Sequence, residues 1–255
     1  MYKSRWGLFW WLKSGTYKEN KKSNIITYWL VIFEYNMRKD MIIMNKAYEF
    51  DEIVQNVFLP IYPLIANQIK RETKIDNGVC LDIGCGGGQL GFALMKITNL
   101  DVIFLDKNKD ALDIANKRSE ELGIQYSANT ILGDVQDIPL NNECINLVIS
   151  RNSLWFGEEK KKSLEEIYRI LSEDGVAYIG CGFGDEKTKN QVCEKMTEID
   201  GEDWSKKRKQ STEGNDVGFY NGILKEIGIK NFNIKDDEEG LWLIIKKLYH
   251  PKIKV

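Results

Sequence analysis

Histidine is nearly missing from the sequence, and so is any close pairing of cysteines. His250, the only histidine of 255 residues, lies near the C-terminal end, and the five cysteines include no Cys-x-x-Cys pair. Histidine triads and most zinc sites need several histidines or clustered cysteines. The sequence therefore argues against a histidine-based metal site or triad, and we expect no metal. Free cysteines are typical of a reducing compartment, which predicts a cytoplasmic protein.

A surplus of either charge is also absent. The formal net charge is −2 and the pI is about 5.7, so no basic field is available to attract nucleic acid. Hydrophobic residues make up 43% of the chain and charged residues 29%, as in a globular protein with one large domain. We expect no nucleic-acid partner and no transmembrane segment, whereas the oligomeric state is not encoded in these patterns.

Residues 1–43 differ in composition from the rest and form an atypical N-terminal extension. The first 40 residues hold four of the seven tryptophans, and Lys and Arg outnumber Asp and Glu by eight to three. The longest uncharged run here, Ser23 to Phe33, is too short to span a bilayer, which takes roughly 20 residues. Two interpretations stay open: an amphipathic extension that binds a membrane surface or a partner, or a translation start at Met37, Met41 or Met44. We favour the second.

The most informative stretch runs from Val79 to Gly91. It begins as a buried strand, breaks into glycines and resumes as a helix, an arrangement that brings a ligand against bare backbone. A dinucleotide fingerprint needs Gly-x-Gly-x-x-Gly, but Gln89 stands at the third glycine position. The observed pattern is Asp82-x-Gly84-x-Gly86-x-Gly88. A carboxylate beside such a turn suits a cationic ligand and would repel a pyrophosphate.

Strand-like and helix-like segments alternate along residues 44–250, which we take as one domain. Helical spacing of apolar residues marks, among others, 110–122, 164–171 and 220–227. Seven strands are predicted: 79–83, 101–106, 130–132, 145–150, 176–181, 231–234 and 241–245. The alternation predicts an α/β fold, a doubly wound and mostly parallel seven-stranded sheet. The polar segment 235–240 joins the last two strands as a hairpin, so we expect the last strand to be antiparallel.

Two further segments are predicted to lie near a ligand. Helical spacing between Tyr48 and Arg71 is interrupted by Pro60 and Pro63, which predicts two short helices, and Tyr62 between the prolines is a candidate to face the ligand. Residues 184–215 are mostly charged and polar, which is typical of a solvated face or a mobile loop. Their place after the fifth strand suggests a substrate-side insertion.

Residues 45–247 resemble the class I S-adenosylmethionine-dependent methyltransferases. Asp82 with Gly84, Gly86 and Gly88 is similar to the first motif of that family. The resemblance implies the Rossmann-like methyltransferase fold, S-adenosylmethionine as the cofactor and S-adenosylhomocysteine as its product. It also implies that the glycine turn receives the methionine part of the cofactor.

The same resemblance implies roles for residues at three other strand ends. Asp106 would accept hydrogen bonds from both ribose hydroxyls, which suits the two oxygens of a carboxylate. Asp134 would accept from the adenine amino group, Val135 would lie along the purine, and Ser150 would face the methionine ammonium. Each residue also has a simpler explanation, such as a helix cap for Asp106 or a turn at 133–134.

The acceptor side is less defined. Arg151, Asn152 and Trp155 follow the fourth strand, where acceptor-binding groups are expected, and together with Tyr62 they are the substrate-side candidates. No catalytic base is identified. The leading function is methyl transfer to a small-molecule acceptor by direct displacement at the sulfonium methyl. The alternatives are an NAD-dependent oxidoreductase, disfavoured by Asp82 and Gln89, and a non-catalytic S-adenosylmethionine-binding regulatory subunit.

The scarcity of histidine also predicts how such a site titrates. Without histidine in the core, methyl transfer is expected to show no essential titration near pH 6.5. Asp82, Asp106 and Asp134 are expected to stay ionised well below neutrality when they hold a cationic, hydrogen-bonded ligand, because both effects favour the charged form.

Overall fold

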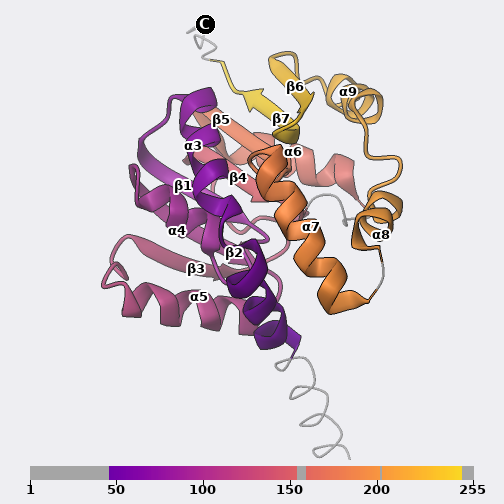
Figure 1. Cartoon of the computed structure of the whole chain (residues 1–255). Helices are drawn as coiled ribbons and strands as arrows, with labels where there is room; N and C mark the ends of the chain where they lie inside the picture. The colour runs from indigo at the N-terminus through magenta and orange to yellow at the C-terminus, as the bar shows by residue number, and fades with distance from the viewer. Residues whose placement is uncertain (1–45, 154–158, 202, 249–255) are drawn as a thin grey trace, which may run out of the picture. The chain divides into compact units, whose positions relative to one another are not determined.

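The computed structural model describes residues 46–153, 159–201 and 203–248, and the predicted extension 1–43 lies outside them. Its centre is one seven-stranded sheet with the order β3-β2-β1-β4-β5-β7-β6 (Figure 1). The strands are β1 (Asn77–Ile83), β2 (Asn99–Asp106), β3 (Ala128–Leu132), β4 (Ile145–Arg151), β5 (Leu171–Cys181), β6 (Phe232–Asp237) and β7 (Gly240–Lys246).

The directions of the strands agree with the predicted topology. Strands β1 to β5 pair in parallel, and β7 pairs antiparallel with both β5 and β6. Parallel neighbours require a crossover after each strand, and the alternating helices of the chain supply it. The carboxyl ends of β1, β2 and β4 therefore meet at one edge of the sheet, where ligands bind in such folds.

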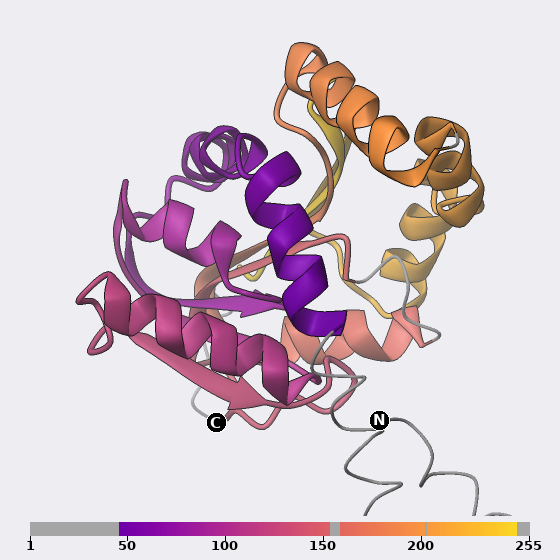
Figure 2. The same cartoon turned by 60° about the horizontal axis from the view of Figure 1, so that its bottom comes forward.

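Helices cover both faces of the sheet. Side chains along each strand point alternately to the two faces, so each face carries its own apolar cluster that a layer of helices buries. Cys80 faces one cluster and Leu81 the other, and the same alternation runs through β7 from Trp242 to Ile245. Figure 2 shows the layers around the sheet. The first cluster includes α3 (Ile61–Thr73), α4 (Gln89–Met95) and Leu112 of α5 (Lys109–Glu121); the second includes α6 (Lys160–Ile170) and α9 (Val217–Glu226).

The two helices predicted before the first strand are present. Residues 46–53 are helical and continue into the short π-helix η1 (Val54–Phe58), after which α3 begins. Pro60 is the N-cap of α3 and Pro63 lies in its first turn. Prolines are tolerated there because the first N–H groups of a helix have no intrahelical partner.

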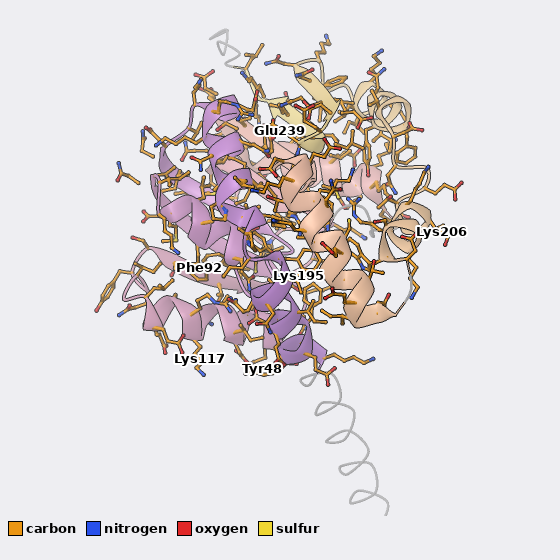
Figure 3. All side chains as sticks on the ribbon, in the orientation of Figure 1. Tyr48, Phe92, Lys117, Lys195, Lys206 and Glu239 are labelled. Atoms are coloured by element: carbon orange, nitrogen blue, oxygen red, sulfur yellow. The ribbon has the colours of Figure 1, made fainter. Side chains whose placement is uncertain are left out.

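The charged segment 184–215 forms helices, so the mobile-loop interpretation of its composition is wrong and the solvated-face interpretation holds. α7 (Glu186–Asp200) begins at Asp185, whose side chain accepts from the Thr188 N–H, and α8 (Trp204–Ser211) begins at Asp203, which accepts from the Lys206 N–H. Lys195 and Lys206 extend from these helices into solvent (Figure 3). Among the described helices, none is both long and apolar enough to cross a bilayer.

Two glycines provide a matched test of the sheet. Gly180 of β5 lies opposite Trp242 of β7, and a Cβ at Gly180 would collide with the Leu241 carbonyl and the Trp242 indole. We predict that Gly180→Ala lowers the free energy of unfolding by about 1–3 kcal/mol. Gly222→Ala, in open space on α9, should instead raise it by about 1 kcal/mol. Urea denaturation measures both; equal effects would contradict the packing described.

Candidate functional site

A cavity of about 380 Å³ opens at the carboxyl ends of β1, β2 and β4. Its walls come from the helix at 46–53, the turn between β1 and α4, the end of β2 and the end of β4. Seven of the residues singled out in the sequence line it: Tyr62, Asp82, Gly84, Gly86, Asp106, Arg151 and Asn152.

The glycine turn leaves bare backbone toward this cavity at one position above all. Gly86 lines the cavity with a φ of +53°, and a Cβ placed on it would meet nothing within 4 Å. A side chain there would be strained and would fill the cavity. Gly88, with a φ of +83°, is different, because its Cβ would collide with Phe92 and Phe104 beneath the turn. Gly86 therefore makes room for a ligand, whereas Gly88 makes room for the core.

Asp82 is a buried carboxylate under this turn. Its Oδ2 accepts from the Gly91 N–H at 3.0 Å, at the start of α4, and the side chain lines the cavity. Burial raises the pKa of Asp82 to about 7, and the charge of Asp106 adds to the shift while the Gly91 hydrogen bond opposes it. A protein without a bound cation therefore holds a proton on Asp82 up to a much higher pH than an exposed carboxyl group does. The expectation that Asp82 stays ionised well below neutrality applies to the complex, in which a bound cation favours the charged form.

Asp106 holds the turn in place from the end of β2. Its Oδ2 accepts from the Gly86 N–H at 3.0 Å and its Oδ1 accepts from the Asn108 N–H at 2.9 Å. The cap of α5 is Asn108, which accepts from the Asp110 N–H, so the simpler explanation of Asp106 as that helix cap is wrong. Each carboxylate oxygen can still accept a second hydrogen bond from a ligand.

A polar network that the sequence did not indicate fixes the far side of the turn. Arg118 of α5 forms an ion pair with Asp51 at 2.8 Å and also donates to the Gly87 carbonyl. Gln89 donates to the other oxygen of Asp51 at 2.6 Å. Asp51 and Arg118 are 67 positions apart, and no local pattern connects them. The network attaches the helix at 46–53 to the glycine turn.

On the β4 side of the cavity, Arg151 packs against three aromatic rings, of which that of Tyr62 also lines the cavity. The Arg151 guanidinium lies 5.6 Å from the ring centres of Phe58 and Phe183 and 5.7 Å from that of Tyr62, and its Nε donates to the Gly182 carbonyl at 3.1 Å. Burial raises the pKa of Tyr62 above its ordinary value, although the charge of Arg151 opposes the shift. Tyr62 therefore stays protonated at neutral pH.

The remaining predicted residues lie apart from the cavity wall. Ser150 is buried and its hydroxyl donates to the Ile83 carbonyl at 2.9 Å. Asp134 is exposed, with its carboxylate accepting from the Gln136 N–H at 2.9 Å, and Val135 is half-buried; neither lines the cavity. Trp155 lies outside the described residues.

Comparison with known proteins identifies the family of the chain. The family model described as "Methyltransferase domain" matches residues 74–227. The chain belongs to this methyltransferase family. A solved structure from Methanococcus maripaludis, provisionally assigned as an S-adenosyl-L-methionine-dependent methyltransferase, is 34% identical, with a TM-score of 0.77 over 82% of this chain and 95% of that one. The family match favours the methyltransferase prediction over an NAD-dependent oxidoreductase.

Two curated relatives are named for different acceptors. The cypemycin N-terminal methyltransferase of Streptomyces is 25% identical over 138 residues, covering 53% of this chain and 54% of that protein. The demethylmenaquinone methyltransferase of Lactobacillus johnsonii is 33% identical over 108 residues, covering 41% and 44%. The chain thus spans about half the length of these relatives. S-adenosylmethionine is the methyl donor of the family, and the residues present fit it: Gly86 leaves an open cradle, and Asp82 and Asp106 flank it.

The raised pKa of Asp82 generates a prediction about stability. A carboxyl group whose pKa rises from the unfolded value of about 3.8 to about 7 on folding disfavours the folded state increasingly as pH rises between these values. Asp82→Asn removes this loss. The free energy of unfolding of the variant minus that of the unmodified protein should therefore increase by about 2–3 kcal/mol from pH 5 to pH 8. Urea denaturation at the two pH values measures the gain. A difference that does not change with pH would contradict the buried, uncompensated carboxylate.

Proposed function

We propose that the chain transfers a methyl group from S-adenosylmethionine to a small-molecule acceptor. The observation that carries this proposal is the division of one cavity into two unlike sides. The open turn at Gly86 lies with Asp82 and Asp106 on one side, and Tyr62, Arg151 and Asn152 lie on the other. A cavity of about 380 Å³ suits small ligands.

We assign the acidic side to the cofactor. Asp106, already fixed by two backbone N–H groups, would accept the ribose hydroxyls with its remaining lone pairs. Asp82 would face the positively charged methionine end, and Gly84 and Gly86 would offer backbone to it. Ser150 would act there through its carbonyl. Asp134 and Val135 stay proposals for the adenine, at the end of β3 beyond the described wall of the cavity.

The chain's own contribution to the reaction is chiefly positioning. Bound S-adenosylmethionine supplies a methyl group on a positively charged sulfur, which is already activated for transfer. The aromatic side chains around Arg151 exclude water, and the fixed turn sets the alignment. Tyr62, with its raised pKa, can donate a hydrogen bond at neutral pH but is a poor base. Because the described residues of the acceptor side offer no effective base, we take the acceptor to be nucleophilic as bound.

The regulatory-subunit alternative makes a different prediction for the acceptor side. A protein that only binds the cofactor needs the glycine turn and the carboxylates, but it has no use for a second binding surface in the same cavity. Arg151 at the end of β4 and Tyr62 of α3, which line the cavity, support the enzyme. Size exclusion of the purified protein against cell extract would show whether it travels with a partner.

The turn at Gly86 provides a clean test of cofactor binding. We predict that Gly86→Val weakens S-adenosylhomocysteine binding by about tenfold or more (~1.4 kcal/mol) and leaves a folded protein, because the side chain enters the cavity. Gly123→Val is the control: its φ is +68° and its Cβ also meets nothing, but Gly123 lies outside the cavity. Calorimetric titration of both variants separates ligand exclusion from backbone strain. Equal affinities in the two variants would remove Gly86 from the site.

The acceptor class is tested directly by methyl transfer. Incubation with labelled S-adenosylmethionine and a cell-extract ultrafiltrate should transfer label to a compound of the ultrafiltrate, and the retained macromolecules should stay unlabelled. Label found only in the retained fraction would contradict a small-molecule acceptor while leaving the cofactor assignment intact.

A further inference from the structure

Arg151 is a half-buried cation that has no anionic partner among the described residues. Its guanidinium lies among the rings of Phe58, Tyr62 and Phe183, and its Nε donates to the Gly182 carbonyl. Nη2 is buried and has no hydrogen-bond partner among the described residues. Within the same part of the chain no carboxylate lies within 4.0 Å of Arg151, although most other arginines there form an ion pair.

Such an arrangement is costly unless a ligand completes it. A buried charged donor without a partner carries its full desolvation cost, which ring contacts offset only in part. The neighbouring residue repeats the pattern, because the side-chain oxygen of Asn152 is also buried without a partner among the described residues. Asn152 has a φ of +68°, and its N–H donates to the Gly180 carbonyl at 2.8 Å. Both side chains line the cavity.

The position of Arg151 separates it from the cofactor side. Asp106 ends β2 and the glycine turn follows β1, whereas Arg151 ends β4 and leans toward Phe183, just after β5. In the strand order β2-β1-β4-β5, the basic end is thus displaced from the acidic one along the edge of the sheet. Arg208 of α8 lies 4.6 Å from the Phe183 ring centre and adds a second positive charge to this end.

We propose that Arg151 binds a carboxylate of the acceptor, so that the substrate is a small carboxylic acid with an apolar or aromatic frame. A guanidinium matches a carboxylate through paired N–H donors, and burial strengthens the pair. The ring of Tyr62, which lines the cavity, would contact the frame, while Phe58 and Phe183 pack around the guanidinium. The unpartnered Asn152 oxygen would accept from an N–H or O–H group of the same molecule. This assignment rests on the proposed small-molecule acceptor.

The test uses benzoate and its neutral analogue benzamide as probes, with the protein saturated with S-adenosylhomocysteine. Ligand-observed NMR titration should show benzoate bound at least about tenfold more tightly than benzamide. Arg151→Met should remove that preference while changing S-adenosylhomocysteine affinity less than about threefold, and Arg151→Lys should retain part of it. Arg71→Met, which removes a surface arginine paired with Glu239, is the matched control and should leave both affinities unchanged.

Three results would overturn the proposal. One is equal binding of benzoate and benzamide, or no binding of benzoate, by the unmodified protein. Another is a preference for benzoate that survives in Arg151→Met. The third is a tenfold loss of S-adenosylhomocysteine affinity in that variant, which would assign Arg151 to the carboxylate of the cofactor. If Arg151→Met does not fold, the relative affinities for benzoate and benzamide of the unmodified protein and of Arg151→Lys decide whether Arg151 binds the carboxylate. If the unmodified protein binds S-adenosylhomocysteine but shows no preference for benzoate, this proposal fails while the proposed function stands.

Discussion

The site depends on one electrostatic constraint, a carboxylate buried under a turn of bare backbone. Asp82 lies at the end of β1, where a parallel sheet leaves little water, and its only hydrogen bond that the structure describes comes from the Gly91 N–H. Such a carboxylate is unfavourable when ionised and alone, so its pKa rises to about 7. A cationic ligand over the turn would relieve this cost. The buried carboxylate thereby lowers the free energy of unfolding of the free protein and favours binding of the ligand.

Each end of the cavity holds a charged side chain with few partners, negative at one end and positive at the other. Asp82, on the proposed cofactor side, is buried, and Arg151, on the proposed acceptor side, is half-buried; among the described residues each has fewer partners than its charge requires. Between them the geometry is rigid, because Asp106 fixes Gly86 and the Asp51–Arg118 pair fixes Gly87. Rigid backbone with under-partnered charges at both ends suits the proposed binding of two ligands side by side, as a group-transfer enzyme requires.

Local sequence patterns predicted the fold well, because the sheet is built from short apolar runs with clear breaks. The antiparallel β7, the glycine turn and Asp106 at the end of β2 were all predicted from such patterns. α7 and α8 were not, because they bury few side chains and so show little apolar periodicity. The Asp51–Arg118 pair and the rings around Arg151 join distant segments, which spacing along the chain cannot reveal.

The central claim is that a cationic cofactor binds over Asp82, and proton release tests it most directly. Calorimetric titration with S-adenosylmethionine at pH 7, repeated in buffers of different ionisation enthalpy, gives the number of protons released on binding. Because burial raises the pKa of Asp82 to about 7, ionisation of Asp82 by the ligand should release a fraction of a proton per site. Asp82→Asn should abolish this release. The same release by both proteins, or none by the unmodified one, would contradict the account.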